Sequence, residues 1–91
     1  MPYIKKERRP IYDEQIDALL VVIASNWKVE NINGDMNYII SRLVNRVYAH
    51  QTAGYDIRSD GVKTLECAKH EFERRKLDPY EDKKRRANGD C

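Results

Sequence analysis

The chain has 91 residues, which is enough for one domain that buries only ~65% of the surface of its unfolded chain. Its 17 basic and 15 acidic side chains leave a net charge of +2, too small by itself to indicate nucleic-acid binding. Two cysteines without a signal peptide exclude a secreted disulfide scaffold. The longest apolar run, residues 18–24, is far shorter than the ~20 residues of a membrane span. We therefore expect one cytoplasmic domain over residues 1–91 with no membrane partner.

The N-terminal region is predicted to be an extended arm followed by an apolar helix. Residues 1–12 are polar and interrupted by prolines, and Asp13 suits the first turn of a helix. Val21 and Val22 lie outside the core face of that helix, so apolar groups cover more of it than one small core requires. We therefore expect a second subunit to cover it, in a homo-oligomer. The expected core face comprises Ile16, Leu19, Leu20, Ile23 and Trp27.

A loop containing Asn33 and Gly34 precedes the second expected helix, which runs from about Met36 to Ala49. Asp35 is its predicted N-cap, because a carboxylate accepts hydrogen bonds from the free N–H groups of a first turn. The apolar stripe of this helix is Met36, Ile40, Leu43 and Val47.

Ser59 or Asp60 is expected to cap a third helix, in which Glu71 can pair with arginines three and four residues later. Its expected buried stripe is Val62, Leu65, Ala68 and Phe72. Asp78-Pro79-Tyr80-Glu81 is typical of a capping box, so Pro79 either ends one helix and starts another or leaves a kink. The predicted fold is all-α, with three main helices and a basic C-terminal helical tail over residues 79–91.

Polar side chains recur every four residues along one shoulder of the second helix. A pair of guanidinium groups beside an aromatic ring suits a ligand that has a phosphate and a base. The candidate ligand-binding residues are Asn37, Tyr38, Arg42, Asn45 and Arg46. In the alternative, both arginines pair with acids such as Glu66, Glu71 or Glu73, and Tyr38 packs in the core.

The other constellations favour a protein that is not an enzyme. Cys67 and His70 are three residues apart, but two ligands are too few for structural zinc, and Cys91 with His50 would complete the set poorly. We expect no metal and no cofactor. Pro2 resembles the catalytic proline of tautomerases, although the basic segment after it is not the strand that they need. The basic run at residues 83–86 supports at most weak, non-specific contact with nucleic acid.

Four blocks of the sequence are distinctive: Met1-Pro2-Tyr3-Ile4, Gly34-Asp35-Met36-Asn37-Tyr38, Leu65-Glu66-Cys67-Ala68-Lys69 and Pro79-Tyr80-Glu81-Asp82-Lys83-Lys84. With these blocks the chain resembles a family of small uncharacterised proteins of phages, bacteria and archaea. The resemblance implies a compact helical protein, often encoded by mobile or viral genomes, with no assigned reaction. We therefore expect a non-catalytic, phage-type accessory protein that sequesters a small, anionic, nucleotide-derived ligand, such as a signalling molecule of antiviral defence. The alternative is a protein-interaction or non-specific nucleic-acid-associated helical protein.

Overall fold

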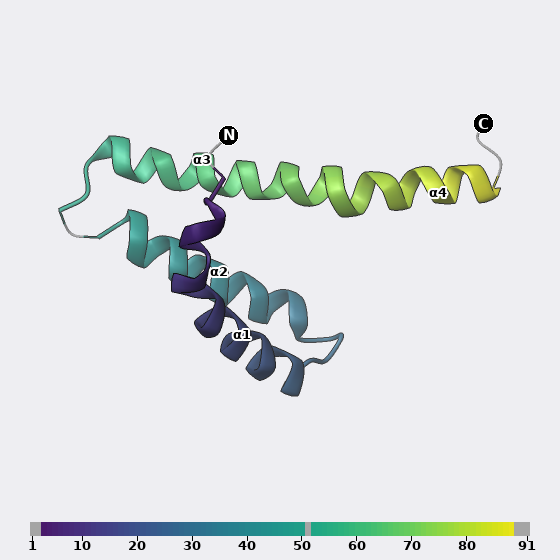
Figure 1. The fold of residues 1–91 in the computed structure, drawn as a ribbon, viewed down its shortest axis with the longest axis horizontal. Helices are drawn as coiled ribbons and strands as arrows, with labels where there is room; N and C mark the ends of the chain where they lie inside the picture. Colours follow the sequence, from purple (N-terminus) through teal and green to yellow (C-terminus); the bar gives the residue numbers. More distant parts are fainter. Residues whose placement is uncertain (1–2, 51, 89–91) are drawn as a thin grey trace. The chain divides into compact units, whose positions relative to one another are not determined.

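The structure is a computed structural model that describes residues 3–50 and 52–88 (Figure 1). Its elements in chain order are the short 3₁₀-helix η1 (Lys6–Arg8), α1 (Pro10–Ser25), α2 (Ile32–Tyr48), α3 (Tyr55–Phe72), the π-helical turn η2 (Glu73–Leu77) and α4 (Asp78–Asn88). The described residues contain no strand, so the predicted all-α fold of three main helices with a C-terminal helical segment is confirmed. The chain divides into two units, Met1–Leu43 and Val44–Cys91, which are described separately.

The first helix begins earlier in the chain than the sequence pattern indicated. Pro10 occupies the start of α1, where its fixed φ suits a helix and its missing N–H is not needed. The carbonyl of Arg9 accepts hydrogen bonds from the N–H groups of Tyr12 and Asp13, both at 3.0 Å. The predicted start at Asp13 was therefore wrong, and residues 6–8 and 10–12 of the expected extended arm are helical. The proline initiates this helix rather than preventing it.

The predicted core face of the first helix is exposed. No residue of α1 is buried, and Ile23 alone within it is half-buried. Leu20 is 54% exposed and Val22 is 58% exposed. The end of α1 is closed by its own polar side chains, since Ser25 Oγ donates to the Val21 carbonyl and Asn26 Nδ2 to the Val22 carbonyl, both at 2.8 Å. The apolar surface of α1 is thus exposed to solvent in the described chain.

The second helix also begins early, at Ile32 rather than Met36. Asp35 lies inside its first turn and donates its backbone N–H to the Asn31 carbonyl at 2.9 Å, so the prediction that Asp35 is the N-cap was wrong. Asp35 still lies in the first turn, where a negative charge interacts favourably with the helix dipole. In the first unit the half-buried side of α2 comprises Ile32, Met36 and Ile39, whereas the predicted stripe residues Ile40 and Leu43 are exposed.

In the second unit, the end of α2 packs closely on α3. Gly61 is buried beneath Tyr48, and a Cβ added at Gly61 would lie 3.1 Å from the Cβ of Tyr48. The Tyr48 and Thr64 hydroxyls are hydrogen-bonded at 3.1 Å. In the connection between the helices, Arg58 Nε donates to the carbonyl of Ala53 at 3.2 Å, and Ala53 is buried. These contacts make a small-residue junction rather than a large apolar core.

The third helix begins at Tyr55, after Gly54, and not at the predicted caps Ser59 and Asp60, which lie within it. Its predicted buried stripe is exposed as well, with Val62 at 63% and Phe72 at 64%. Small side chains explain the difference, because the close approach of α2 occurs at Gly61 and not at the large residues.

Helices α3 and α4 join through η2 into one uninterrupted helical run (Figure 1). Glu73 and Asp78 both have helical dihedral angles, and the Asp78 N–H donates to the Glu73 carbonyl five residues earlier. A proline within a helix clashes with the carbonyl four residues before it, and a wider π-turn directly before Pro79 relieves that conflict. Asp78 therefore does not cap a new helix, and the predicted capping box was wrong.

Candidate functional site

Helices α1 and α2 line a groove within the first unit. Its volume is about 360 Å³. Its walls are mostly apolar, and Asn26 and Asp35 supply polar groups beside them. The lining residues are Leu19, Val22, Ile23, Asn26, Asp35, Tyr38 and Ile39. A groove of this kind accepts a flat or apolar moiety and leaves a few polar groups to orient it.

Tyr38 connects this groove to the predicted ligand-binding shoulder. Arg42 Nη1 donates to the Tyr38 hydroxyl at 3.4 Å, one helical turn away. Beside them, Ser41 Oγ donates to Asn37 Oδ1 at 3.3 Å. Tyr38 is 63% exposed, so the alternative in which it packs in the core was wrong for the described chain. The structure thus brings an aromatic ring and a guanidinium group together at the edge of an apolar groove.

Asn45 and Arg46 continue the same shoulder on α2 but belong to the second unit. Both are exposed, and the groove in the first unit is lined without them. Because residues four apart lie on one face of a helix, Arg46 follows Arg42 on the face that begins at Tyr38. All five predicted residues are therefore on one helix, and Tyr38 also lines the groove.

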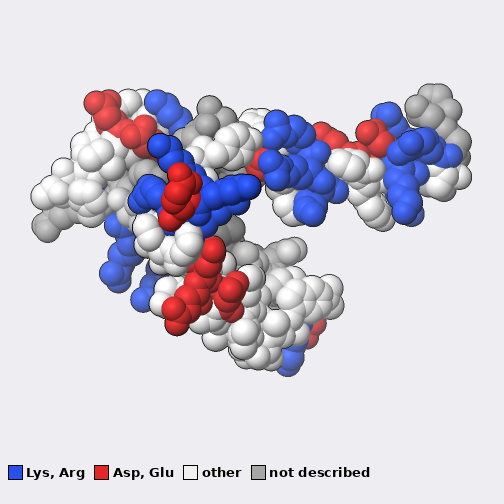
Figure 2. Space-filling model, in the orientation of Figure 1, with Lys and Arg blue, Asp and Glu red and all other residues white. Residues whose placement is uncertain are grey.

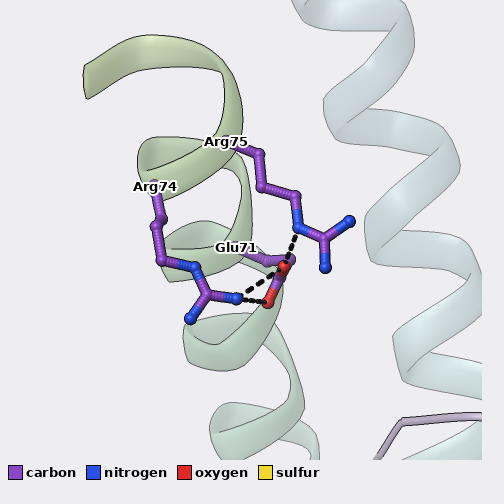
Figure 3. Close-up of polar contacts among 3 residues, drawn as sticks. All are labelled: Glu71, Arg74 and Arg75. Atoms are coloured by element: carbon purple, nitrogen blue, oxygen red, sulfur yellow. Dashed lines mark hydrogen bonds and ion pairs between the residues drawn. The ribbon is translucent and has the colours of Figure 1, made fainter. Parts of the chain in front are cut away.

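The acids proposed as partners of the shoulder arginines have partners close by in sequence. Glu71 forms ion pairs with Arg74, at 2.9 Å, and with Arg75, as the three- and four-residue spacing predicted (Figure 3). Both carboxylate oxygens of Glu71 accept from Arg74 Nη2, each at 2.9 Å. Figure 3 shows the carboxylate lying between the two guanidinium groups. Much of the acceptor capacity of Glu71 is therefore used on its own helix.

The two other acids, Glu66 and Glu73, both lie beside His70. Its Nε2 lies 3.4 Å from a carboxylate oxygen of Glu66, and its Nδ1 lies 3.5 Å from one of Glu73. Within the described residues of the first unit, Arg42 has no carboxylate partner. A guanidinium group bonded only to a phenol hydroxyl keeps most of its five N–H donors for a ligand.

Basic side chains gather over η2 and α4, with acidic ones between them (Figure 2). Arg85 Nη2 lies 3.3 Å from Asp82, an example of that mixing. Clustered cations attract nucleic-acid phosphates, but interspersed carboxylates weaken the attraction. This surface therefore favours at most salt-sensitive, non-specific binding.

The described residues offer no metal site. No three His, Cys, Asp or Glu side chains among them are placed to hold one ion, and Cys67 is a half-buried free thiol. Cys91 and Pro2, from two of the weaker hypotheses, lie outside the described residues. No helix among those described is both long and apolar enough to cross a bilayer. Absence of bound zinc remains a prediction, which elemental analysis of the purified protein would test.

The comparison with protein families decides what this helical chain is related to. The model of a Domain of unknown function (DUF6899) matches residues 1–91. The chain belongs to this family. No curated protein and no solved structure matched it. The match confirms the predicted membership of an uncharacterised family, and it assigns no function to the chain.

The groove is the part of the candidate site that sequence reasoning missed. Leu19 and Ile23 were expected to form a core, and Asp35 was expected to cap a helix, whereas all three line the groove. The signal was present in the excess of apolar residues around Val22, which also lies in the groove wall. That excess was attributed to a subunit interface alone, because spacing along one helix does not show which second helix lies opposite.

Proposed function

We propose that this DUF6899 protein is a non-catalytic, phage-type accessory protein that binds and sequesters a small nucleotide-derived ligand, for instance a signalling molecule of antiviral defence. The observation that carries the proposal is the hydrogen bond between Arg42 and Tyr38 at the edge of the groove. The base of a nucleotide would enter the groove beside Tyr38, and its phosphate would accept hydrogen bonds from Arg42. The phage association comes from the family resemblance.

The neighbouring polar groups extend this proposed site along α2. Arg46 would bind a second phosphate or other oxygens of the same phosphate. Asn37 and Asn45 would form hydrogen bonds with the hydroxyl groups of the ligand or with the edge of its base. The carboxylate of Asp35 keeps an anion away from the start of the helix and along the shoulder instead. The ligand is thus expected to lie along α2 with its apolar part toward α1.

A homo-oligomer is part of the proposal. The described chain exposes large apolar side chains on every main helix, and Ala53 is its buried apolar residue. Chains that leave so much apolar surface in water gain free energy by association. A groove shared between subunits also encloses more of a small ligand than one short chain can.

A thermal-shift screen with mononucleotides, dinucleotides and cyclic dinucleotides tests the function directly. A ligand that binds only the folded state raises stability by about 2.7 kcal/mol at 100 times its dissociation constant. We expect a selective rise in melting temperature for one class of nucleotide, and its loss in Arg42→Ala. A flat response to the whole library would contradict the proposal. Affinity for mixed-sequence DNA or RNA that falls steeply with salt would instead favour the nucleic-acid alternative.

A further inference from the structure

A stripe of large apolar side chains runs along the helical run of the second unit. Its members are exposed, from 40% for Leu77 to 64% for Phe72. The stripe comprises Val62, Leu65, Phe72, Leu77 and Tyr80. From Val62 to Tyr80 it extends roughly 27 Å at ~1.5 Å per residue. The stripe is not part of the α1–α2 groove, and the proposed ligand does not account for it.

The π-turn η2 keeps this stripe on one face of the helix. Phe72 and Leu77 are five residues apart, a spacing that would turn Leu77 away in a regular α-helix. In a π-turn, hydrogen bonds span five residues, as between Asp78 and Glu73, so residues five apart lie nearly above one another. The turn that accommodates Pro79 therefore also aligns Leu77 and Tyr80 with Phe72.

The stripe is nearly symmetric about the middle of the run. Val62 and Tyr80 each lie nine residues from position 71, and Leu65 and Leu77 each lie six from it. Phe72 is next to the centre. Two identical helices paired in opposite directions would therefore bring Val62 opposite Tyr80 and Leu65 opposite Leu77, with the two Phe72 side chains on either side of the centre. A two-fold symmetric contact requires this kind of self-complementary surface.

The charges of the run favour the same direction of pairing. Residues 55–73 contain five acidic and three basic side chains, whereas residues 74–88 contain three acidic and seven basic ones. Antiparallel pairing sets the acidic half of one copy beside the basic half of the other. Parallel pairing would set two basic halves together, which costs free energy. Figure 2 shows the basic side chains gathered over η2 and α4.

The C-terminal helix also needs such a partner. Among the described residues of its unit, α4 adjoins η2, the segment that precedes it in the chain, and the described side chains of α4 are all exposed. Most of the stability of a helix in a protein comes from packing of its apolar face rather than from helix propensity, and the α4 part of the run has no such packing among the described residues. A second helix along the stripe would cover Tyr80 and hold α4 in place.

We propose that a second copy of this chain binds along α3, η2 and α4 in the antiparallel direction. Val62 of one copy then lies opposite Tyr80 of the other, Leu65 lies opposite Leu77, and the two Phe72 side chains meet near the two-fold axis. This contact uses a different surface from the oligomer contact expected at α1, and it does not depend on any ligand.

Sedimentation of the full chain tests whether the stripe pairs. Phe72→Glu introduces two like charges near the axis, so its molar mass at micromolar concentration should fall below that of the parent protein. The matched control is Val29→Glu, since Val29 is 75% exposed and lies outside the stripe, and this control should keep the parent mass. Circular dichroism establishes that both variants remain helical. A parent protein that is monomeric, or a Phe72→Glu variant of unchanged mass, would overturn the proposal.

Cysteine cross-linking tests the direction without depending on stability. In a chain with Cys67→Ser and Cys91→Ser, Val62→Cys alone should give no disulfide-linked dimer, because its counterpart is ~27 Å away. The combination of Val62→Cys with Tyr80→Cys should give the linked dimer under mild oxidation. Efficient linkage by Val62→Cys alone would show parallel pairing, and no linkage in the combination would show no contact. Either result would overturn the antiparallel arrangement.

Discussion

Helices α1 and α4 are both exposed in the described chain, but their amino-acid compositions are opposite. Between Pro10 and Ser25, α1 has three acidic side chains, no basic one, and apolar residues on most sides. Between Asp78 and Asn88, α4 is mostly charged, with Tyr80 as its large apolar residue. A helix that is apolar all round is stable when it is covered, whereas one that is polar all round depends on local pairs and on its neighbours along the chain. The two ends of this protein therefore owe their helices to different forces.

The same contrast separates the two candidate binding surfaces. The groove beside α1 is mostly apolar and has a guanidinium group at its edge, so a small ligand bound there would meet both an apolar wall and directional hydrogen-bond donors. The surface over α4 has many cations interspersed with acids, so it favours weak and salt-sensitive attraction. Substitutions at each end can test whether this division holds.

The largest effect is expected where the apolar helix is most easily broken. Val22→Glu places a carboxylate on α1 at a groove-lining position that we expect the oligomer to cover. An uncompensated buried charge costs about 3–5 kcal/mol, so the assembly should dissociate and the melting temperature should fall. Light scattering at micromolar concentration gives the mass, and Val29→Glu supplies a comparison at an exposed loop valine. A parent protein that is already monomeric would refute the expected α1 interface.

This contrast also explains how much of the molecule the sequence could predict. Helical periodicity located three main helices and the pairing of Glu71 with Arg74 and Arg75, because these depend on residues three and four apart. Helix starts were misplaced, since Pro10 initiates α1 and Gly34 lies inside α2, where a loop was expected. Proline and glycine often break helices, but here each lies in the first turn of its helix, where it is tolerated.

The candidate site was predictable in part for the same reason. The shoulder of Tyr38 and Arg42 follows from four-residue spacing, and the structure joins the two by a hydrogen bond. The groove wall of Leu19 and Val22 depends on which helix lies opposite, and spacing within one helix does not contain that information. The π-turn before Pro79 was missed because it arises from a conflict between proline geometry and helix continuity.

The second prediction sharpens the contrast between binding and structural arginines. Arg42→Ala should weaken nucleotide binding by about 1.5–3 kcal/mol, the usual size of a hydrogen bond to a charged group, with an unchanged melting temperature. Arg58→Ala should instead lower the melting temperature and leave nucleotide affinity unchanged. The reason is that the Arg58 guanidinium donates hydrogen bonds to the carbonyls of Ala53 and His50 in the α2–α3 connection. Calorimetric titration and thermal unfolding of both variants measure the two quantities. A destabilised Arg42→Ala that binds as tightly as the parent would refute the proposed clamp.

The third prediction compares the two helical glycines. A Cβ at Gly34 meets nothing within 4 Å, so Gly34→Ala should stabilise α2 by about 0.5–1 kcal/mol through helix propensity. The same change at Gly61 sets a methyl group against Tyr48, and overpacking of this kind costs about 1–3 kcal/mol. Denaturant unfolding should therefore find Gly61→Ala clearly less stable than Gly34→Ala. An equal increase in the free energy of unfolding for both variants would mean that Tyr48 moves aside freely and that the junction is loosely packed.

The smallest effect is expected in the charged half, where local pairs hold the helix. Glu71→Gln removes the ion pairs with Arg74 and Arg75 but keeps the size of the side chain, so stability should fall by about 0.5–1 kcal/mol. Asp60→Asn is the matched control, since its pair with Lys63 is longer, at 3.9 Å, and more exposed, and its loss should have a smaller effect. Because ions screen exposed charges, the difference between the two variants should shrink from low salt to 1 M salt. A difference that stayed constant with salt would mean that Glu71 stabilises this region by packing rather than by charge.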